Sequence, residues 1–78
     1  MITADTVKLL TGMNTDLLAQ ALGASGYKDC KFKTAKFLGI TNGNQFCYSV
    51  TFREDDRDQT GKVFVGYDSA TGFITADF

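Results

Sequence analysis

Lysines close to aromatic residues are the first candidates for chemistry in this chain. Single-stranded nucleic acids are bound by cations that follow the backbone and by rings on which bases stack. One alternative function is therefore single-stranded nucleic-acid binding through Lys28, Lys31, Lys33 and Lys36. However, lysine on the outer positions of a first strand also protects a sheet edge from unwanted pairing. The sequence pI near 5.0 also argues against a partner bound mainly through phosphate charge.

Carboxylates form the second group, in a polar connection expected to run from Glu54 to Gly61. Within it, the segment from Asp56 to Gly61 resembles the first half of a calcium loop, with oxygen ligands at alternate positions and glycine at the sixth. The second half is missing, because Tyr67 stands where a bidentate glutamate is needed. We therefore expect solvated surface charge from Glu54, Asp55, Asp56 and Asp58.

Catalytic and metal-binding groups are sparse. The chain has no histidine, so a nucleophilic Cys or Ser lacks its usual general base. Its cysteines, Cys30 and Cys47, are too few for a disulfide scaffold or a zinc site of four ligands. We predict a protein that is not an enzyme and has no cofactor or metal.

Length and composition indicate one folded domain over residues 1–78. The apolar content of 44% and the net charge of -1 are ordinary for globular proteins. No apolar run reaches membrane-spanning length, and the start lacks the basic and apolar segments of a signal peptide. A cytosolic protein is therefore expected.

The apolar residues separate a helical half from a sheet half. All aromatic residues fall between Tyr27 and Phe78, whereas every leucine except Leu38 precedes Tyr27. Thr3 or Asp5 is expected to cap a first helix that ends at a left-handed Gly12. Asn14 or Thr15 starts a second helix, closed by Gly23 and Gly26, whose apolar stripe is Leu17, Leu18, Ala21 and Leu22. The pair has the outline of a helix-turn-helix, but its second helix offers no Lys or Arg to DNA.

Alternating residues predict the first two strands. The first run includes Cys30 and Phe32, and in the second run the core-facing residues are Phe46, Tyr48, Val50 and Phe52. An Asn42–Gly43 turn of two residues pairs Leu38 with Cys47, whereas a longer loop with a left-handed Gly43 places Leu38 opposite Phe46. Hydrophobic parity favours the longer loop, which leaves Phe37 on the outer face.

The third strand is expected at residues 62–67 and the fourth at residues 73–78, joined by a turn that ends at Gly72. The segment from Val63 to Ile74 resembles the closing hairpin of several small α+β modules, PepSY-type domains among them. The likeness covers about a dozen residues of turn chemistry and implies a hairpin without a function. The predicted fold is α+β, with two short N-terminal helices packed on one face of a four-stranded antiparallel meander.

These observations lead by elimination to a small non-enzymatic protein-binding module, of a kind common among accessory and phage-encoded proteins. It would act through a sheet edge or the outer sheet face. Phe37 is a candidate because a large exposed ring rimmed by charge often marks an interface. Phe64 joins it on that face if the third strand buries Val63, Val65 and Tyr67. The acidic residues 54–58 would steer association. A homodimer through a strand edge is an alternative arrangement.

Overall fold

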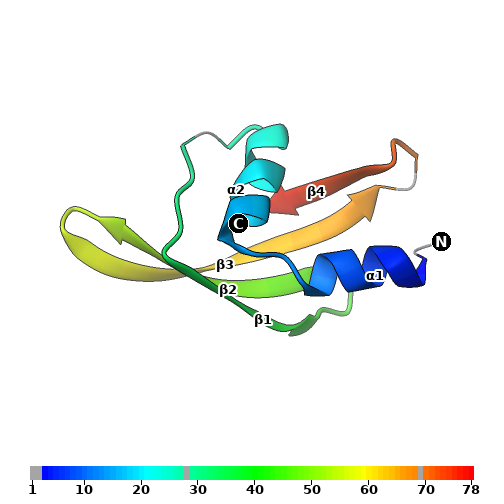
Figure 1. Cartoon of the computed structure of the whole chain (residues 1–78), viewed down its shortest axis with the longest axis horizontal. Helices are drawn as coiled ribbons and strands as arrows, with labels where there is room; N and C mark the ends of the chain where they lie inside the picture. Colours follow the sequence, from blue (N-terminus) through cyan, green and yellow to red (C-terminus); the bar gives the residue numbers. More distant parts are fainter. Residues whose placement is uncertain (1–2, 28, 69) are drawn as a thin grey trace.

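The described residues form two helices followed by four strands. The structure is a computed structural model and describes residues 3–27, 29–68 and 70–78. The elements are α1 (Ala4–Thr11), α2 (Thr15–Ala24), β1 (Thr34–Ile40), β2 (Phe46–Glu54), β3 (Arg57–Asp68) and β4 (Phe73–Asp77). The strands form one antiparallel sheet in chain order, and the helices pack on one face of it (Figure 1). The predicted α+β meander is confirmed.

Side-chain caps define where both helices begin. Thr3 accepts a hydrogen bond from the N–H of Thr6 (3.2 Å), and Asn14 accepts one from the N–H of Leu17 (2.9 Å). The expectation of a left-handed Gly12 is wrong, because its φ is -111°. The chain instead continues directly into Met13, whose N–H donates to the Tyr48 hydroxyl (3.0 Å).

The core lies between the helices and the inner face of the sheet. Alternation along β2 points Phe46, Tyr48 and Val50 inward, as predicted, and all three are buried. Phe52 is only half-buried, but it packs against the core as predicted and contacts Phe32 edge-to-face. The largest fully buried side chains are Leu10, Leu18 and Leu22 from the helical half and Tyr48, Val50, Val63 and Val65 from the sheet.

A β-bulge at Leu38 changes the predicted register of the first hairpin. The favoured longer loop, with Leu38 opposite Phe46, is wrong, because Ile40 pairs with Phe46. Beyond the bulge Phe37 pairs with Tyr48, which is the register of the two-residue turn. Asn44 takes the positive φ (59°) that was expected at Gly43. The prediction that Phe37 faces outward is wrong: its ring contacts those of Phe46 and Tyr48 on the helix-covered side.

Two connections also differ from the prediction. The segment from Cys30 to Lys33 lies outside β1, although the N–H of Lys33 still donates to the Thr51 carbonyl (2.7 Å). The expected polar connection is mostly strand, since β2 and β3 continue to Glu54 and Arg57 and leave a turn of Asp55 and Asp56. Both turn residues have positive φ (52° and 60°), as a tight two-residue hairpin requires.

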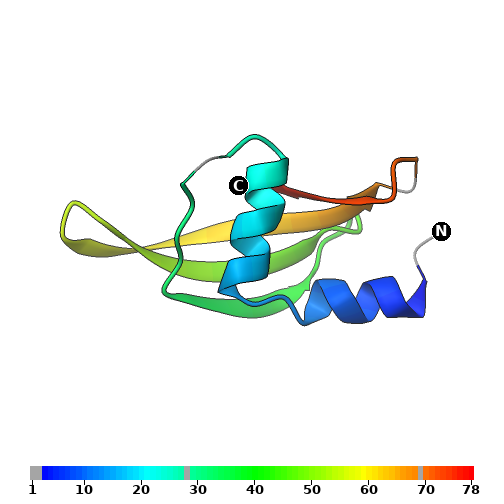
Figure 2. The ribbon, with the colours of Figure 1, turned by 45° about the horizontal axis from the view of Figure 1, so that its top comes forward.

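The long β2–β3 hairpin makes the molecule elongated, with extents of 42 × 23 × 19 Å. Its tip projects to the left of both helices in Figure 2, so the helices cover only part of the sheet. Of the helices in the described ranges, neither is long and apolar enough to cross a membrane.

Candidate protein-binding surface

An apolar groove opens between the helices and the edge strand β4. Leu9 of α1, Met13 of the helix–helix link and Leu17 and Ala21 of α2 form one wall. Residues 71–75, which include part of the β3–β4 turn, form the other wall, and the volume enclosed is about 860 Å³. α2 packs against β4, whereas α1 runs at an angle to α2 (Figure 2). Residues of both helices therefore line the groove.

Two large side chains at the groove are exposed to solvent. Leu9 is 47% exposed and Phe73 is 71% exposed, and both line the groove. An apolar concavity with exposed large side chains at its margin is typical of a surface that binds a partner. Sequence reasoning missed this site, because two distant parts of the chain, residues 9–25 and 71–75, form it.

The edge of β4 beside this groove is partly closed. The N–H of Ala76 donates to the hydroxyl of Ser25 at the end of α2 (3.1 Å), so this N–H points away from β3. Backbone groups of alternate residues point to the same side of an antiparallel strand. The N–H and C=O of Ile74 therefore also point away from β3. The edge is capped at Ala76 and open at Ile74.

Three carboxylates lie one helical turn or one strand pairing away from residues that line the groove, and none of them lines it. Asp5 lies one helical turn before Leu9, Asp16 lies one turn before Gln20, and Asp68 pairs with Phe73 across the last hairpin. Apart from Lys8, the Lys and Arg residues in the described part of the chain fall between Lys31 and Lys62. Both ion pairs among the described residues, Lys33–Asp58 and Arg53–Asp58, also lie between Lys31 and Lys62. Near the groove the three carboxylates therefore outnumber the single cation Lys8, and the local net charge is negative.

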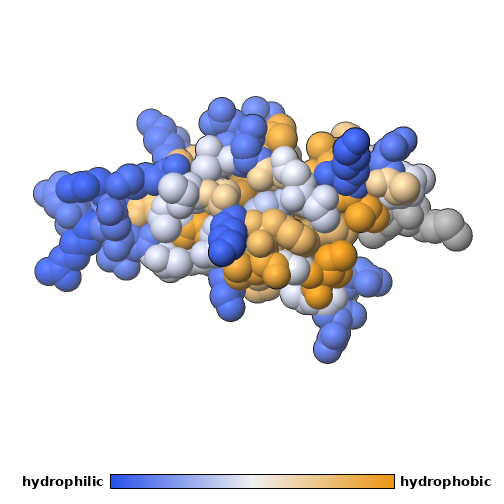
Figure 3. All heavy atoms as spheres, turned by 60° about the horizontal axis from the view of Figure 1, so that its bottom comes forward, coloured by the Kyte–Doolittle hydropathy of each residue, from blue (hydrophilic) through white to orange (hydrophobic). Residues whose placement is uncertain are grey.

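The opposite edge of the sheet, β1, carries a second set of exposed apolar residues. Leu38 at the bulge is 49% exposed and Ile40 is 55% exposed. Figure 3 looks at the side on which β1 lies, with apolar side chains in its central and right-hand parts and hydrophilic ones at the hairpin tip on the left. The bulge interrupts the ladder here, and bulges disfavour pairing of edges with other strands. The edge of β1 is therefore less suited to strand addition than that of β4.

The residues expected to form one protein-binding surface do not lie together. Phe37 is on the inner face, whereas Phe64 is on the outer face, because Val63 and Val65 are buried and Tyr67 packs partly buried against the core. Phe64 pairs with Cys47 and Asp77 on the neighbouring strands. Phe64 is seven positions along β3 from Arg57, roughly 20 Å along the strand, so the acidic turn does not adjoin it.

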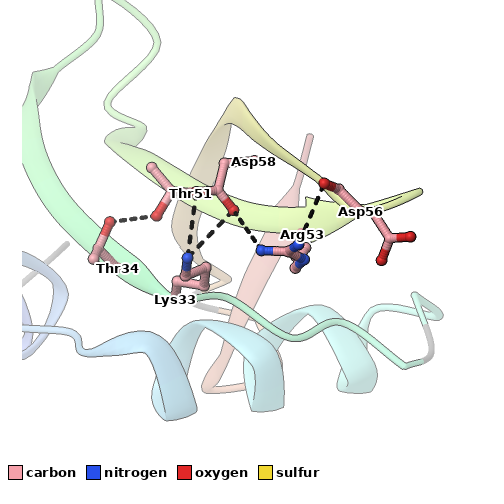
Figure 4. Close-up of polar contacts among 6 residues, drawn as sticks. All are labelled: Lys33, Thr34, Thr51, Arg53, Asp56 and Asp58. Carbon is pink, nitrogen blue, oxygen red and sulfur yellow. Dashed lines mark hydrogen bonds and ion pairs between the residues drawn. The ribbon is translucent and has the colours of Figure 1, made fainter.

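Ion pairs occupy part of the acidic segment (Figure 4). Asp58 contacts the ammonium of Lys33 (3.2 Å) and the guanidinium of Arg53 (3.9 Å), and Arg53 also donates to the backbone carbonyl of Asp56 (3.3 Å). Thr34 and Thr51 share a hydrogen bond next to this cluster (2.6 Å). Glu54, Asp55 and Asp56 are exposed. A search of the described residues for groups of at least three potential metal ligands finds none.

The lysines proposed for nucleic-acid binding are dispersed. Lys28 lies outside the described residues, Lys31 lies in the segment before β1, and Lys33 pairs with Asp58. Lys36 is on the outer face, in register with Ser49 and, through it, with Lys62 of β3. Lys62 and Phe64 share this face because they are two residues apart on one strand.

A tyrosine–carboxylate contact joins the end of the helical half to the end of the chain. The Tyr27 hydroxyl donates to Asp77 Oδ1 (2.5 Å) and raises its own pKa, because ionisation would lose this bond and place two negative charges together. The same bond and the N–H of Phe78 lower the pKa of the Asp77 carboxyl. The rings of Tyr27 and Phe78 meet edge-to-face with centroids 5.0 Å apart.

No protein-family model matches the chain, and no curated protein or solved structure matches it.

Proposed function

We propose that this protein is a small, non-enzymatic protein-binding module that acts through the β4 edge of its sheet and the adjoining groove. The observation that carries the proposal is the groove, where the exposed Leu9 and Phe73 stand at the margin of an apolar hollow. Burial of such side chains by a partner contributes about 25 cal/mol per Å² of apolar surface removed from water. The same chemistry gives no support for catalysis, because the groove lining contains no charged side chain.

Paired variants on the two sheet edges test the proposal. The double variant Leu9→Asp, Phe73→Ser alters the groove, and Leu38→Asp, Ile40→Ser alters the β1 edge at similarly exposed leucines. Each would serve as bait in a pull-down from the native host after its fold has been checked by circular dichroism. We expect partners of the parent to be retained by the β1 variant and lost by the groove variant. Retention by the groove variant would exclude the groove as the binding site.

Single-stranded nucleic-acid binding is the second candidate, supported by the row of Lys36, Ser49 and Lys62 on the outer face. Phe64 lies on the same face two residues from Lys62, where a base could stack. Gel-shift assays at low and moderate salt test this function, because phosphate-dominated binding weakens steeply with salt. The variant Lys36→Ser, Lys62→Ser should abolish any such binding, and binding unchanged by it would exclude this face.

We also propose that the protein is cytosolic. Cys47 lies on the outer face opposite Phe64, whereas Cys30 packs against the core from the other face. No disulfide joins them. Titration of thiols in the unfolded, unreduced protein should detect both sulfhydryls, and detection of neither would contradict this location.

A further inference from the structure

We infer that the partner of the β4 groove is an extended peptide segment, with apolar side chains at alternate positions and basic flanking residues, which adds to the sheet as a short strand beside β4. This inference rests on the proposed function and specifies the class of partner. It follows from the backbone of β4, from the shape of the groove and from the charge around it.

The backbone of β4 favours a strand over a helix. Ile74 presents its N–H and C=O away from β3, on the side where the Ser25–Ala76 bond shows the free edge to lie. An extended segment completes such hydrogen bonds, whereas a helix uses its own backbone groups internally. Because the cap at Ala76 closes one end of the edge, the added strand is confined to the stretch around Phe73 and Ile74.

The groove accounts for the alternate apolar side chains. Ile74 lines the groove and lies on the inner parity of β4 together with the buried Ala76. Every second side chain of a strand added beside β4 points to the same helix-covered side. These side chains would enter the hollow next to Ala24 and Gln20 of α2. The remaining side chains of the segment would face the outer side of the sheet.

Charge around the groove distinguishes a basic partner from a second copy of this chain. Asp5, Asp16 and Asp68 lie next to groove residues in the helices and the last hairpin, against the single cation Lys8 beside Leu9. None of the three takes part in an ion pair among the described residues, although Asp68 accepts a hydrogen bond from the N–H of Ala70 (2.9 Å). In a symmetric dimer the same surface meets itself, so these carboxylates would approach one another. Lysine or arginine next to the apolar positions of another protein would complement them and speed association.

Selection from a phage-displayed library of short linear peptides tests the inference without knowledge of the natural partner. We expect enriched peptides to show apolar residues at alternate positions and an excess of Lys and Arg over Asp and Glu. In a series of peptides, each amide of the best binder would be N-methylated in turn. We expect binding to be lost for every second position, because only alternate N–H groups of the added strand face β4. Enrichment of helical spacing or of acidic peptides, or no enrichment at all, would overturn the inference.

Two protein variants locate the backbone contact. Ile74→Ala removes the side chain but keeps the N–H at the free edge, whereas Ile74→Pro removes that N–H as well. Because the N–H points away from β3, neither substitution removes a hydrogen bond between β3 and β4. We expect the selected peptide to bind Ile74→Ala and to lose binding to Ile74→Pro. Equal binding to both would overturn strand addition. The N-methylation series decides the same question if Ile74→Pro does not fold.

A third variant tests charge, and the groove variant Leu9→Asp, Phe73→Ser separates this inference from the proposed function. Asp5→Asn, Asp16→Asn, Asp68→Asn should slow association several-fold at low salt, and an unchanged rate would overturn the basic flank. Peptides that lose binding to Leu9→Asp, Phe73→Ser but have helical spacing would contradict the strand and leave the groove as the site. Peptides indifferent to that variant would show that the groove itself is not used.

Discussion

Tyr48 of β2 is hydrogen-bonded to Leu10 at the end of α1. Its hydroxyl donates to the Leu10 carbonyl and accepts from the N–H of Met13 (3.0 Å), so one side chain satisfies two backbone groups of the link between the helices. Tyr48 and Leu10 are both buried, and the groove residues Leu9 and Met13 adjoin this contact. The sheet therefore holds in place the corner that forms one side of the groove.

Tyr48→Phe should destabilise the fold, because it leaves the N–H of Met13 and the carbonyl of Leu10 without their partner in a buried position. The expected cost is about 1–3 kcal/mol of unfolding free energy. In a domain of this size each kcal/mol lowers Tm by roughly 4–8 °C. Tyr67→Phe is the control, since the Tyr67 hydroxyl has no hydrogen bond to the described residues. Equal Tm values for Tyr48→Phe and Tyr67→Phe would contradict the role of the Tyr48 hydroxyl.

The same hydroxyl predicts a loss of stability in alkali. Burial raises the pKa of Tyr48 above its ordinary value near 10, partly opposed by the hydrogen bond from Met13. A raised folded-state pKa gives stability that is fully present below about pH 10 and is lost as the pH rises through the folded value. The difference in urea midpoint between the parent and Tyr48→Phe should therefore narrow above pH 10. A constant difference would show that Tyr48 ionises equally in both states.

Neighbouring residues of β1 provide a test of the bulge. Phe37 packs on the core and Leu38 is exposed, so Phe37→Asp should prevent folding while Leu38→Asp melts within a few degrees of the parent. If β1 had no bulge, Leu38 would face the core and Phe37 the solvent, and Leu38→Asp would then be the more destabilising substitution. Thermal melts followed by circular dichroism distinguish the two registers.

Elements that depend on local signals were predictable. The caps at Thr3 and Asn14, the apolar stripe of α2 and the alternation from Phe46 onward all lie within a few residues of what they determine. The register of β1 was not, because one inserted residue at Leu38 reverses the parity of Phe37, and alternation in the sequence does not reveal a bulge.

The candidate site was less accessible to prediction than the fold. Leu9, Ala21 and Phe73 meet only after the helices have packed on the last hairpin, and none of them carries a chemical signature. Sequence reasoning instead selected charged and aromatic residues, such as Asp58 and Phe37, which the fold uses in an ion pair and in the core. The two sets share no residue, because a groove depends on what the packing leaves unfilled.

Asp77 should control the ionisation of Tyr27. The hydrogen bond and the negative charge of Asp77 raise the pKa of Tyr27, so its ring should titrate above pH 10 and at lower pH in Asp77→Asn. Ring-proton chemical shifts followed against pH by NMR measure this change, with Asp5→Asn as a charge-matched control. The lowered pKa of Asp77 contributes stability that is present above about pH 4 and is lost in acid. Identical Tyr27 titrations in both variants would exclude the contact.

Ser25 should determine how far the edge of β4 is open. Its hydroxyl accepts from the N–H of Ala76 (3.1 Å), so Ser25→Ala leaves this part-buried donor without its acceptor, at a cost of about 0.5–1.5 kcal/mol. Hydrogen exchange of the Ala76 amide should become faster, and the longer free edge should increase pairing between chains. Ser49→Ala on the outer face is the control, because the Ser49 hydroxyl has no hydrogen bond to the described residues. An unchanged exchange rate in Ser25→Ala would mean that this hydroxyl does not cap β4, and that the edge is open to a partner along its whole length.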